Sequence, residues 1–186
     1  MRKLFFLILA STLLLSCSTV FADEKPIVAT IYINNANSTY DAEITQKLTD
    51  RFNAKLTMYN IQPGNKYIER LNKMGITDIT TAERADLVQA FSGENIDYVV
   101  FAEVQPPILK HWMSMFNVGV NATVTIPVKI IDIKKNVYLY NGKFTKNADN
   151  SAVLGNVGTK AAVMKAMDQI FVQTDEMLST KLALTN

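Results

Sequence analysis

Alternation of hydrophobic and polar residues is clearest between residues 117 and 130. Hydrophobic side chains take every second position: Val118, Val120, Ala122, Val124, Ile126, Val128 and Ile130. A two-residue period predicts a half-buried antiparallel strand. Such a strand would span more than about 40 Å, comparable with a whole domain, so we expect it to bend or protrude. The alternation slips at Ile130-Ile131, as at a β-bulge, and Pro127 is expected at a bulge or an unpaired edge.

Shorter patterns predict the other elements. Further strands are expected at residues 27–33, 56–61, 97–104 and 137–144, the last following a turn at residues 134–136. Helical spacing is found at residues 38–52, 67–74, 80–91 and from about 157 toward the C-terminus. Gly75 is predicted to be the C′ residue that ends the helix at residues 67–74. Residues 80–83 have the pattern of a capping box, and residues 147–158 are predicted to form a surface loop.

The element order β-α-β-α-α-β-β-β-α predicts one α+β domain. We expect a mixed, mostly antiparallel sheet of about five strands with helices packed on it, largely on one face. The strand at 117–130 should pair with 97–104 on one side and with 137–144 on the other.

The first 22 residues predict export. Arg2 and Lys3 precede an apolar stretch at residues 4–15, which is typical of a secretory signal and short for a permanent membrane anchor. Small residues in Val20-Phe21-Ala22 predict cleavage after Ala22, so we assign 1–22 as signal peptide and 23–186 as the single domain.

An alternative processing site overlaps the signal. Residues 14–17, Leu-Leu-Ser-Cys, resemble a lipobox, which would place a lipid on Cys17 and anchor the protein to a membrane. Cys17 is the only cysteine, so cleavage after Ala22 leaves a chain without disulfides.

Charge excludes some classes of partner. Without Arg2 and Lys3, the 19 basic residues become 17, equal to the 17 acidic residues. A balanced chain lacks the basic footprint of a nucleic-acid-binding protein. It argues equally against electrostatic attachment to anionic lipid. We therefore expect membrane association only through lipidation of Cys17.

Candidate chemistry is sparse. His111 is the only histidine, so the usual histidine and cysteine metal sets cannot form, and no phosphate loop is found. We predict no catalytic residues, no metal and no cofactor. Four carboxylates remain candidates for a hydrolase: Glu94, Asp97, Glu103 and Asp132.

One predicted connection is unusually hydrophobic. Six side chains in it form a candidate interaction loop: Lys110, His111, Trp112, Met113, Met115 and Phe116. Tryptophan and methionine are enriched at adaptable interfaces. The same side chains could instead fold back over the sheet as core, and the sequence leaves both readings open.

Two segments resemble a known family. Residues 95–104, NIDYVVFAEV, and residues 128–140, VKIIDIKKNVYLY, are similar to the strand and hairpin motifs of bacterial envelope proteins related to the curli-secretion lipoprotein (CsgG-type) and the N-terminal domain of the Tol-system propeller protein. Asn136 stands where glycine is usual there. The resemblance implies an envelope-located binding or assembly domain and no enzyme.

We therefore expect a non-catalytic periplasmic or outer-membrane-associated protein that binds or helps assemble another envelope component. Its partner would be an envelope protein or a second copy of the chain. The alternative is a small secreted hydrolase that uses carboxylates on cell-wall or extracellular material.

Overall fold

The computed structural model describes residues 25–153 and 157–183 of the 186-residue chain. The predicted signal peptide, its cleavage site and Cys17 lie outside these residues. Within them the elements follow one another along the chain as β1 (Ile27–Asn34), α2 (Asp41–Lys55), β2 (Asn60–Pro63), α3 (Asn65–Lys73), α4 (Arg84–Phe91), β3 (Tyr98–Val104), β4 (Ile108–Met113), β5 (Asn117–Asp132), β6 (Val137–Val153) and α5 (Thr159–Ala183).

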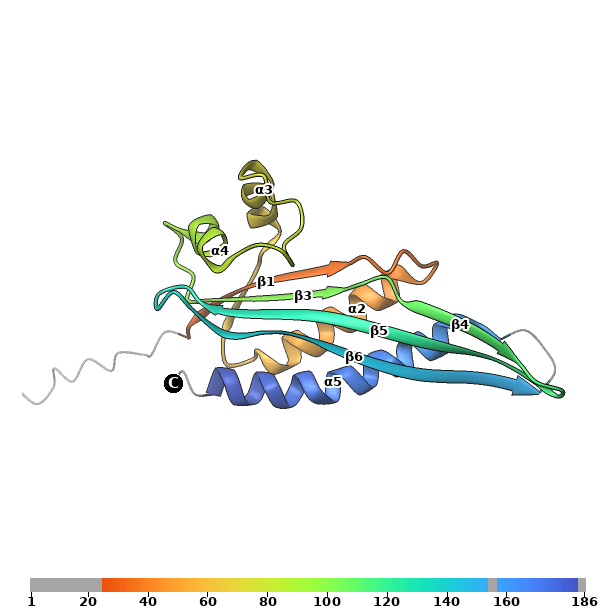
Figure 1. Cartoon of the computed structure of the whole chain (residues 1–186). Helices are drawn as coiled ribbons and strands as arrows, with labels where there is room; N and C mark the ends of the chain where they lie inside the picture. Colours follow the sequence, from red (N-terminus) through yellow and green to blue (C-terminus); the bar gives the residue numbers. More distant parts are fainter. Residues whose placement is uncertain (1–24, 154–156, 184–186) are drawn as a thin grey trace, which may run out of the picture.

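Six strands form one mixed sheet in the described part of the chain (Figure 1). β2, β1 and β3 are parallel neighbours, and β5 then pairs antiparallel with β3, β4 and β6. This confirms the α+β class and the pairing predicted for residues 117–130. The sheet has one strand more than expected because residues 108–113, predicted as part of a connection, form β4.

Both faces of the sheet are covered over part of its area. The two long helices α2 and α5 share one face and pack on alternate residues of β5 such as Val124 and Ile126, which are fully buried. The short helices α3 and α4 cover part of the other face and bury Ile31, Phe101 and Ile131. The expectation that helices lie largely on one face is therefore corrected. β3 is buried along its whole length because helices lie on both sides of it.

A buried lysine attaches the α3–α4 layer to the sheet. Lys129 of β5 points to that layer, and its Nζ donates to the carbonyl oxygens of Ile79, Thr80 and Ala82 at 3.1, 2.7 and 2.8 Å. Burial lowers the pKa of Lys129, and the nearby Asp78 carboxylate opposes this. The three carbonyl groups stabilise the ammonium in place of water.

Several local predictions are confirmed, and others are corrected. The register between β5 and β6 shifts between Ile130 and Ile131, as predicted, and the extra residue, Leu139, lies on β6. Ile130 and Ile131 follow the normal alternation of a strand and therefore enter opposite cores. Asn136 takes a left-handed conformation (φ 53°) in the predicted turn, which asparagine tolerates better than most residues. Gly75 is also left-handed (φ 84°), as a C′ glycine is. The capping box is formed by Glu83 and Asp86, three residues later than predicted.

β6 is longer than expected. Residues 147–153 were predicted as a surface loop, yet they continue β6 opposite residues 117–123 of β5. Their polar composition suits an edge strand with one open side, and pairing with β5 overrides their low strand propensity. Pro127 pairs in regular register with Lys143, so it does not lie at a bulge. On its other side no strand residue of the described part of the chain pairs with it, which agrees with the predicted alternative of an unpaired edge. It lies between the part of β5 that pairs with β3 and the part that pairs with β4.

Candidate functional site

The long strands β5 and β6 continue past the ends of β1 and β3 and project from the body with β4 beside them (Figure 1). We call this three-stranded extension the arm and define it as residues 108–123 and 147–153. The protrusion confirms the expectation drawn from strand length. β4 is exposed along its whole length.

The register assigns each residue of β4 to a face of the arm, because residues directly opposite in an antiparallel pair point the same way. Leu109, His111 and Met113 lie opposite Ala122, Val120 and Val118, on the face that α5 covers nearer the body. Ile108, Lys110 and Trp112 lie on the other face, opposite Thr123, Asn121 and Gly119.

The indole ring of Trp112 packs directly against Gly119. A Cβ at position 119 would overlap the Cε2 and Cζ2 atoms of the indole, so only glycine lets the ring lie this close to β5. Gly119 is consequently buried, while Trp112 remains 41% exposed. In the sequence, Gly119 falls on the polar face of the predicted strand, and nothing in the local pattern predicts that it packs against Trp112.

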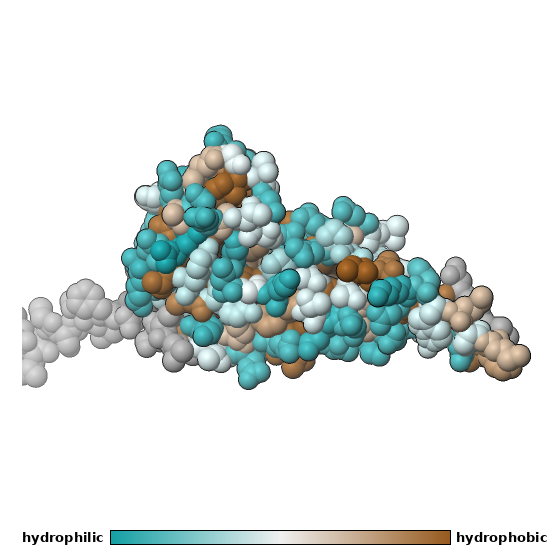
Figure 2. All heavy atoms as spheres, viewed as in Figure 1, coloured by the Kyte–Doolittle hydropathy of each residue, from teal (hydrophilic) through white to brown (hydrophobic). Residues whose placement is uncertain are grey.

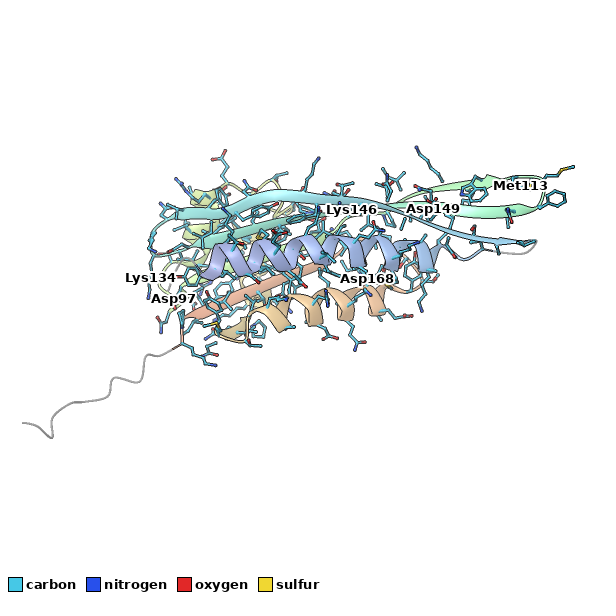
Figure 3. All side chains as sticks on the ribbon, turned by 90° about the horizontal axis from the view of Figure 1, so that it is seen from below. Asp97, Met113, Lys134, Lys146, Asp149 and Asp168 are labelled. Atoms are coloured by element: carbon cyan, nitrogen blue, oxygen red, sulfur yellow. The ribbon has the colours of Figure 1, made fainter. Side chains whose placement is uncertain are left out.

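The end of the arm carries exposed hydrophobic side chains. Met113, Met115 and Phe116, which we call the tip, are 81%, 87% and 64% exposed. Figure 2 shows the light brown hydrophobic surface at this end of the molecule, and Figure 3 places Met113 at the extremity of the arm. The turn is closed by backbone hydrogen bonding, with Ser114 N–H donating to the carbonyl oxygen of Asn117 at 2.7 Å. The tip is thus an ordered turn between two strands.

The six candidate residues are therefore brought together in the arm, with Lys110, His111, Trp112 and Met113 on β4 and Met115 and Phe116 in the turn. They do not fold back as core, so that reading is wrong. The description as a loop is corrected to a strand and its turn. Their role in binding stays a prediction. Ile108 (61%) and Val153 (72%) are further exposed hydrophobic residues of the arm, and Val153 was missed because its segment was predicted to be a polar loop.

Charges on the arm are few. The sequence contains no acidic residue between Glu103 and Asp132. Asp149 is the charged residue of the arm on β6, and its Oδ1 accepts a hydrogen bond from Asn121 Nδ2 at 3.0 Å. Lys143 and Lys146 precede the arm on β6 (Figure 3 labels Lys146 and Asp149).

Glu94, the first of the four candidate hydrolase carboxylates, holds α3 and α4 together. Lys66 Nζ and Arg70 donate to it at 3.1 and 2.6 Å. These hydrogen bonds, that from Lys66 first, lower the pKa of Glu94. Glu103 is buried and accepts a hydrogen bond from Asn35 Nδ2 at 2.8 Å.

Asp97 and Asp132 hold the end of the sheet opposite the tip. Asp97 accepts the Ile27 backbone N–H at 2.6 Å and pairs with Lys134 (Figure 3). Burial raises the pKa of Asp97, but the hydrogen bonds from Lys134 and Ile27 outweigh it and the net shift is downward. Asp132 accepts the Lys135 N–H at 2.8 Å. Neither Glu94 nor Asp97 has the raised pKa of a general acid.

Other kinds of site were sought in the same residues. In the part of the chain that the structure describes, no group of three or more histidine, cysteine, aspartate or glutamate side chains is placed to hold a metal ion. Nor does any helix there combine the length and hydrophobicity needed to cross a bilayer. A shallow groove between α2 and α5 is lined mainly by charged side chains that join the two helices, as in the Lys47–Asp168 ion pair at 2.8 Å.

Comparison with known proteins gives structural likeness only. No protein-family model matches the chain, and no curated protein matches it. Solved structures that match include a lipoprotein from Neisseria meningitidis (16% identity, 80% of this chain and 99% of that chain, TM-score 0.42). A hypothetical protein from Chlamydia trachomatis matches at 12% identity, over 84% of this chain and 99% of that chain, with a TM-score of 0.49. The C-terminal domain of LpoB from Salmonella enterica matches at 9% identity, over 73% of this chain and 90% of that chain, with a TM-score of 0.37. Bacterial lipoproteins are thus among the matched structures; likeness at this level carries no argument for function.

Proposed function

We propose that this protein is a non-catalytic component of the bacterial cell envelope that binds or helps assemble another envelope component through its arm. The observation that carries the proposal is the exposure of the tip. Met115 is 87% exposed, whereas Val120, five residues further along the chain, is fully buried.

The exposed tip is not the result of poor packing. The face of the arm nearest the body is well packed, since Val120, Ala122 and Ala148 share one core with α5. At the end of the arm, by contrast, Met113, Met115 and Phe116 lie next to one another along the chain with most of their surface in water. A contiguous hydrophobic region on an otherwise well-packed domain is typical of a surface that a partner covers.

The envelope location rests on the sequence. Residues 1–22 have the charge, hydrophobic length and small-residue site of a secretory signal. After export, the components that the arm can meet are those of the envelope. An envelope protein or a second copy of the chain would cover the tip as a protein interface.

Site-specific photo-crosslinking in cells of the source organism tests the proposal. A photoreactive residue replaces Met115 in one variant and Met58 in the other. Met58 is the matched control because it is also an exposed methionine (64%) and precedes β2, near the start of β1 and away from the arm.

We expect adducts with an envelope component, or with a second copy of the chain, from position 115 and none from position 58. Adducts from position 58 alone, or none from position 115, would contradict the proposal. A cytoplasmic location of the processed protein would contradict its envelope part.

A further inference from the structure

The free edge of β4 is the least protected edge of the sheet. In the described residues, β2, β4 and β6 each pair with one strand and leave one edge open. β2 is only four residues long and ends at Pro63, and the exposed side chains of β6 are mostly polar or charged. β4 presents exposed Ile108, Leu109 and Met113 and contains no proline or acidic residue. Proteins usually protect such an edge, because it pairs readily with another strand.

The turn shows which backbone groups of β4 are open. Ser114 N–H donates to the carbonyl oxygen of Asn117, and in an antiparallel pair every second residue from that point also bonds to β5. The residues between them direct their N–H and C=O groups away from β5: Leu109, His111 and Met113. No described residue forms a hydrogen bond to these outward groups.

We infer that a second copy of the chain pairs with this edge, β4 antiparallel to β4, so that two arms form one continuous sheet. The inference rests on the proposed function and names its partner. Only an extended polypeptide offers N–H and C=O groups at the spacing of a strand edge. Because the arm projects from the body (Figure 1), antiparallel pairing leaves the two bodies at opposite ends of the joined arms.

The sequence of β4 is complementary to itself in one register. When His111 lies opposite His111 of the second copy, Leu109 lies opposite Met113, and every outward N–H and C=O of these residues has a partner. The same register places Lys110 opposite Trp112 of the second copy, where the ammonium and the indole attract each other. A twofold axis at His111 repeats each of these pairs.

The neighbouring registers lose this complementarity. An axis at Lys110 places two lysines opposite each other and brings Pro107, which has no N–H to donate, into the pairing. An axis at Trp112 places Leu109 opposite Met115, which lies in the turn and not in the strand. The axis at His111 is therefore the register that we propose.

The length of the arm also fits this register. Residues 115–116 of one copy fall opposite residues 106–107 of the other, which are both prolines. The tip thus ends before the point where the Asn35 N–H already occupies the carbonyl oxygen of Val104, at 2.9 Å. Its hydrophobic side chains lie beside the two prolines and are partly removed from water.

The pairing is expected to be weak. β4 contributes six residues, whereas each side of a standard protein interface contributes about 20–30. The dimer should therefore dissociate on dilution.

Analytical ultracentrifugation over a range of concentrations tests the pairing. The sample is the predicted mature chain, residues 23–186, which holds every residue that the structure describes and lacks Cys17. We expect a reversible equilibrium between monomer and dimer. His111→Pro removes an N–H that points away from β5, so it should weaken dimerisation at least about tenfold and leave the unfolding midpoint unchanged.

Cysteine cross-linking tests the register, because the mature chain has no cysteine of its own. His111→Cys places two thiols on residues directly opposite each other, about 5.5 Å apart at Cα, which a disulfide can span. Lys110→Cys is the matched control, since its counterpart in the second copy lies two residues out of register and beyond about 7 Å. With oxidised glutathione as the oxidant, we expect a disulfide-linked dimer from position 111 and little from position 110.

A chain that stays monomeric at every concentration would overturn the inference. So would dimerisation that His111→Pro leaves unchanged, or equal cross-linking from positions 110 and 111. Each result leaves the proposed function separately testable, because a photo-crosslink from position 115 to a different protein would still show that the arm contacts an envelope component. A dimer in solution with no adduct from position 115 in cells would instead contradict the proposed function.

Discussion

Val124→Asp tests the assignment of faces on β5. Val124 is fully buried in the core shared by α2, α5 and the sheet. Burial of a valine side chain contributes about 1.5–3 kcal/mol, and an unpaired buried carboxylate costs several kcal/mol more. We therefore expect a loss above about 5 kcal/mol, which approaches the whole stability of many domains.

Urea unfolding followed by far-ultraviolet circular dichroism measures this loss. Thr123→Asp is the matched control, because Thr123 is the neighbouring residue on the opposite, half-buried face. We expect the control to lose less than about 1 kcal/mol, as surface changes usually do. A Val124→Asp protein with a wild-type unfolding midpoint would show that the face assignment is wrong.

Four further predictions concern the core, the acid response, the arm and processing. Lys129→Met removes the donor from three carbonyl groups and should lower the free energy of unfolding by about 2–4 kcal/mol, measured by urea unfolding; no loss would contradict the role of that lysine. The pKa of Asp97 is lowered in the folded state, so its contribution is present above the unfolded value near 3.9 and is lost as pH falls through the folded pKa. The gap in melting temperature between the parent and Asp97→Asn should therefore narrow below about pH 4, and a constant gap would contradict the assignment. Trp112→Ala should cost less than about 2 kcal/mol, because the indole is 41% exposed, yet should reduce envelope binding; a core-sized loss in a thermal melt would refute its surface role. Intact-mass measurement should find a chain starting at Asp23, and a lipid-modified chain starting at Cys17 would overturn this.

Strong periodicity made the central part of the fold predictable. Alternation along residues 117–130 identified β5, its buried face and its protrusion, because a half-buried strand imposes a two-residue period. The turn at Asn136 and the end of α3 at Gly75 were likewise predictable, since few residues tolerate a positive φ.

The arm itself was harder to predict. Residues 147–153 pair with β5 although their composition is that of a loop, because strand pairing depends on the neighbour more than on intrinsic propensity. β4 follows two prolines and has no buried face, so it lacks the alternation that marks a strand. The packing of Trp112 against Gly119 depends on the register between β4 and β5, which no local sequence pattern encodes.

The central claim, that the arm contacts an envelope component, is tested most directly by measuring whether a cysteine at position 115 is protected from labelling in the envelope. Met115→Cys and Met58→Cys, each in a mature chain with no other cysteine, are labelled with a membrane-impermeant maleimide as purified proteins and in isolated envelopes. If the arm is the contact surface, the cysteine at position 58 is labelled equally in both settings, and the cysteine at position 115 is labelled only in the purified protein. Equal labelling of position 115 in both settings would contradict the claim that the arm contacts an envelope component.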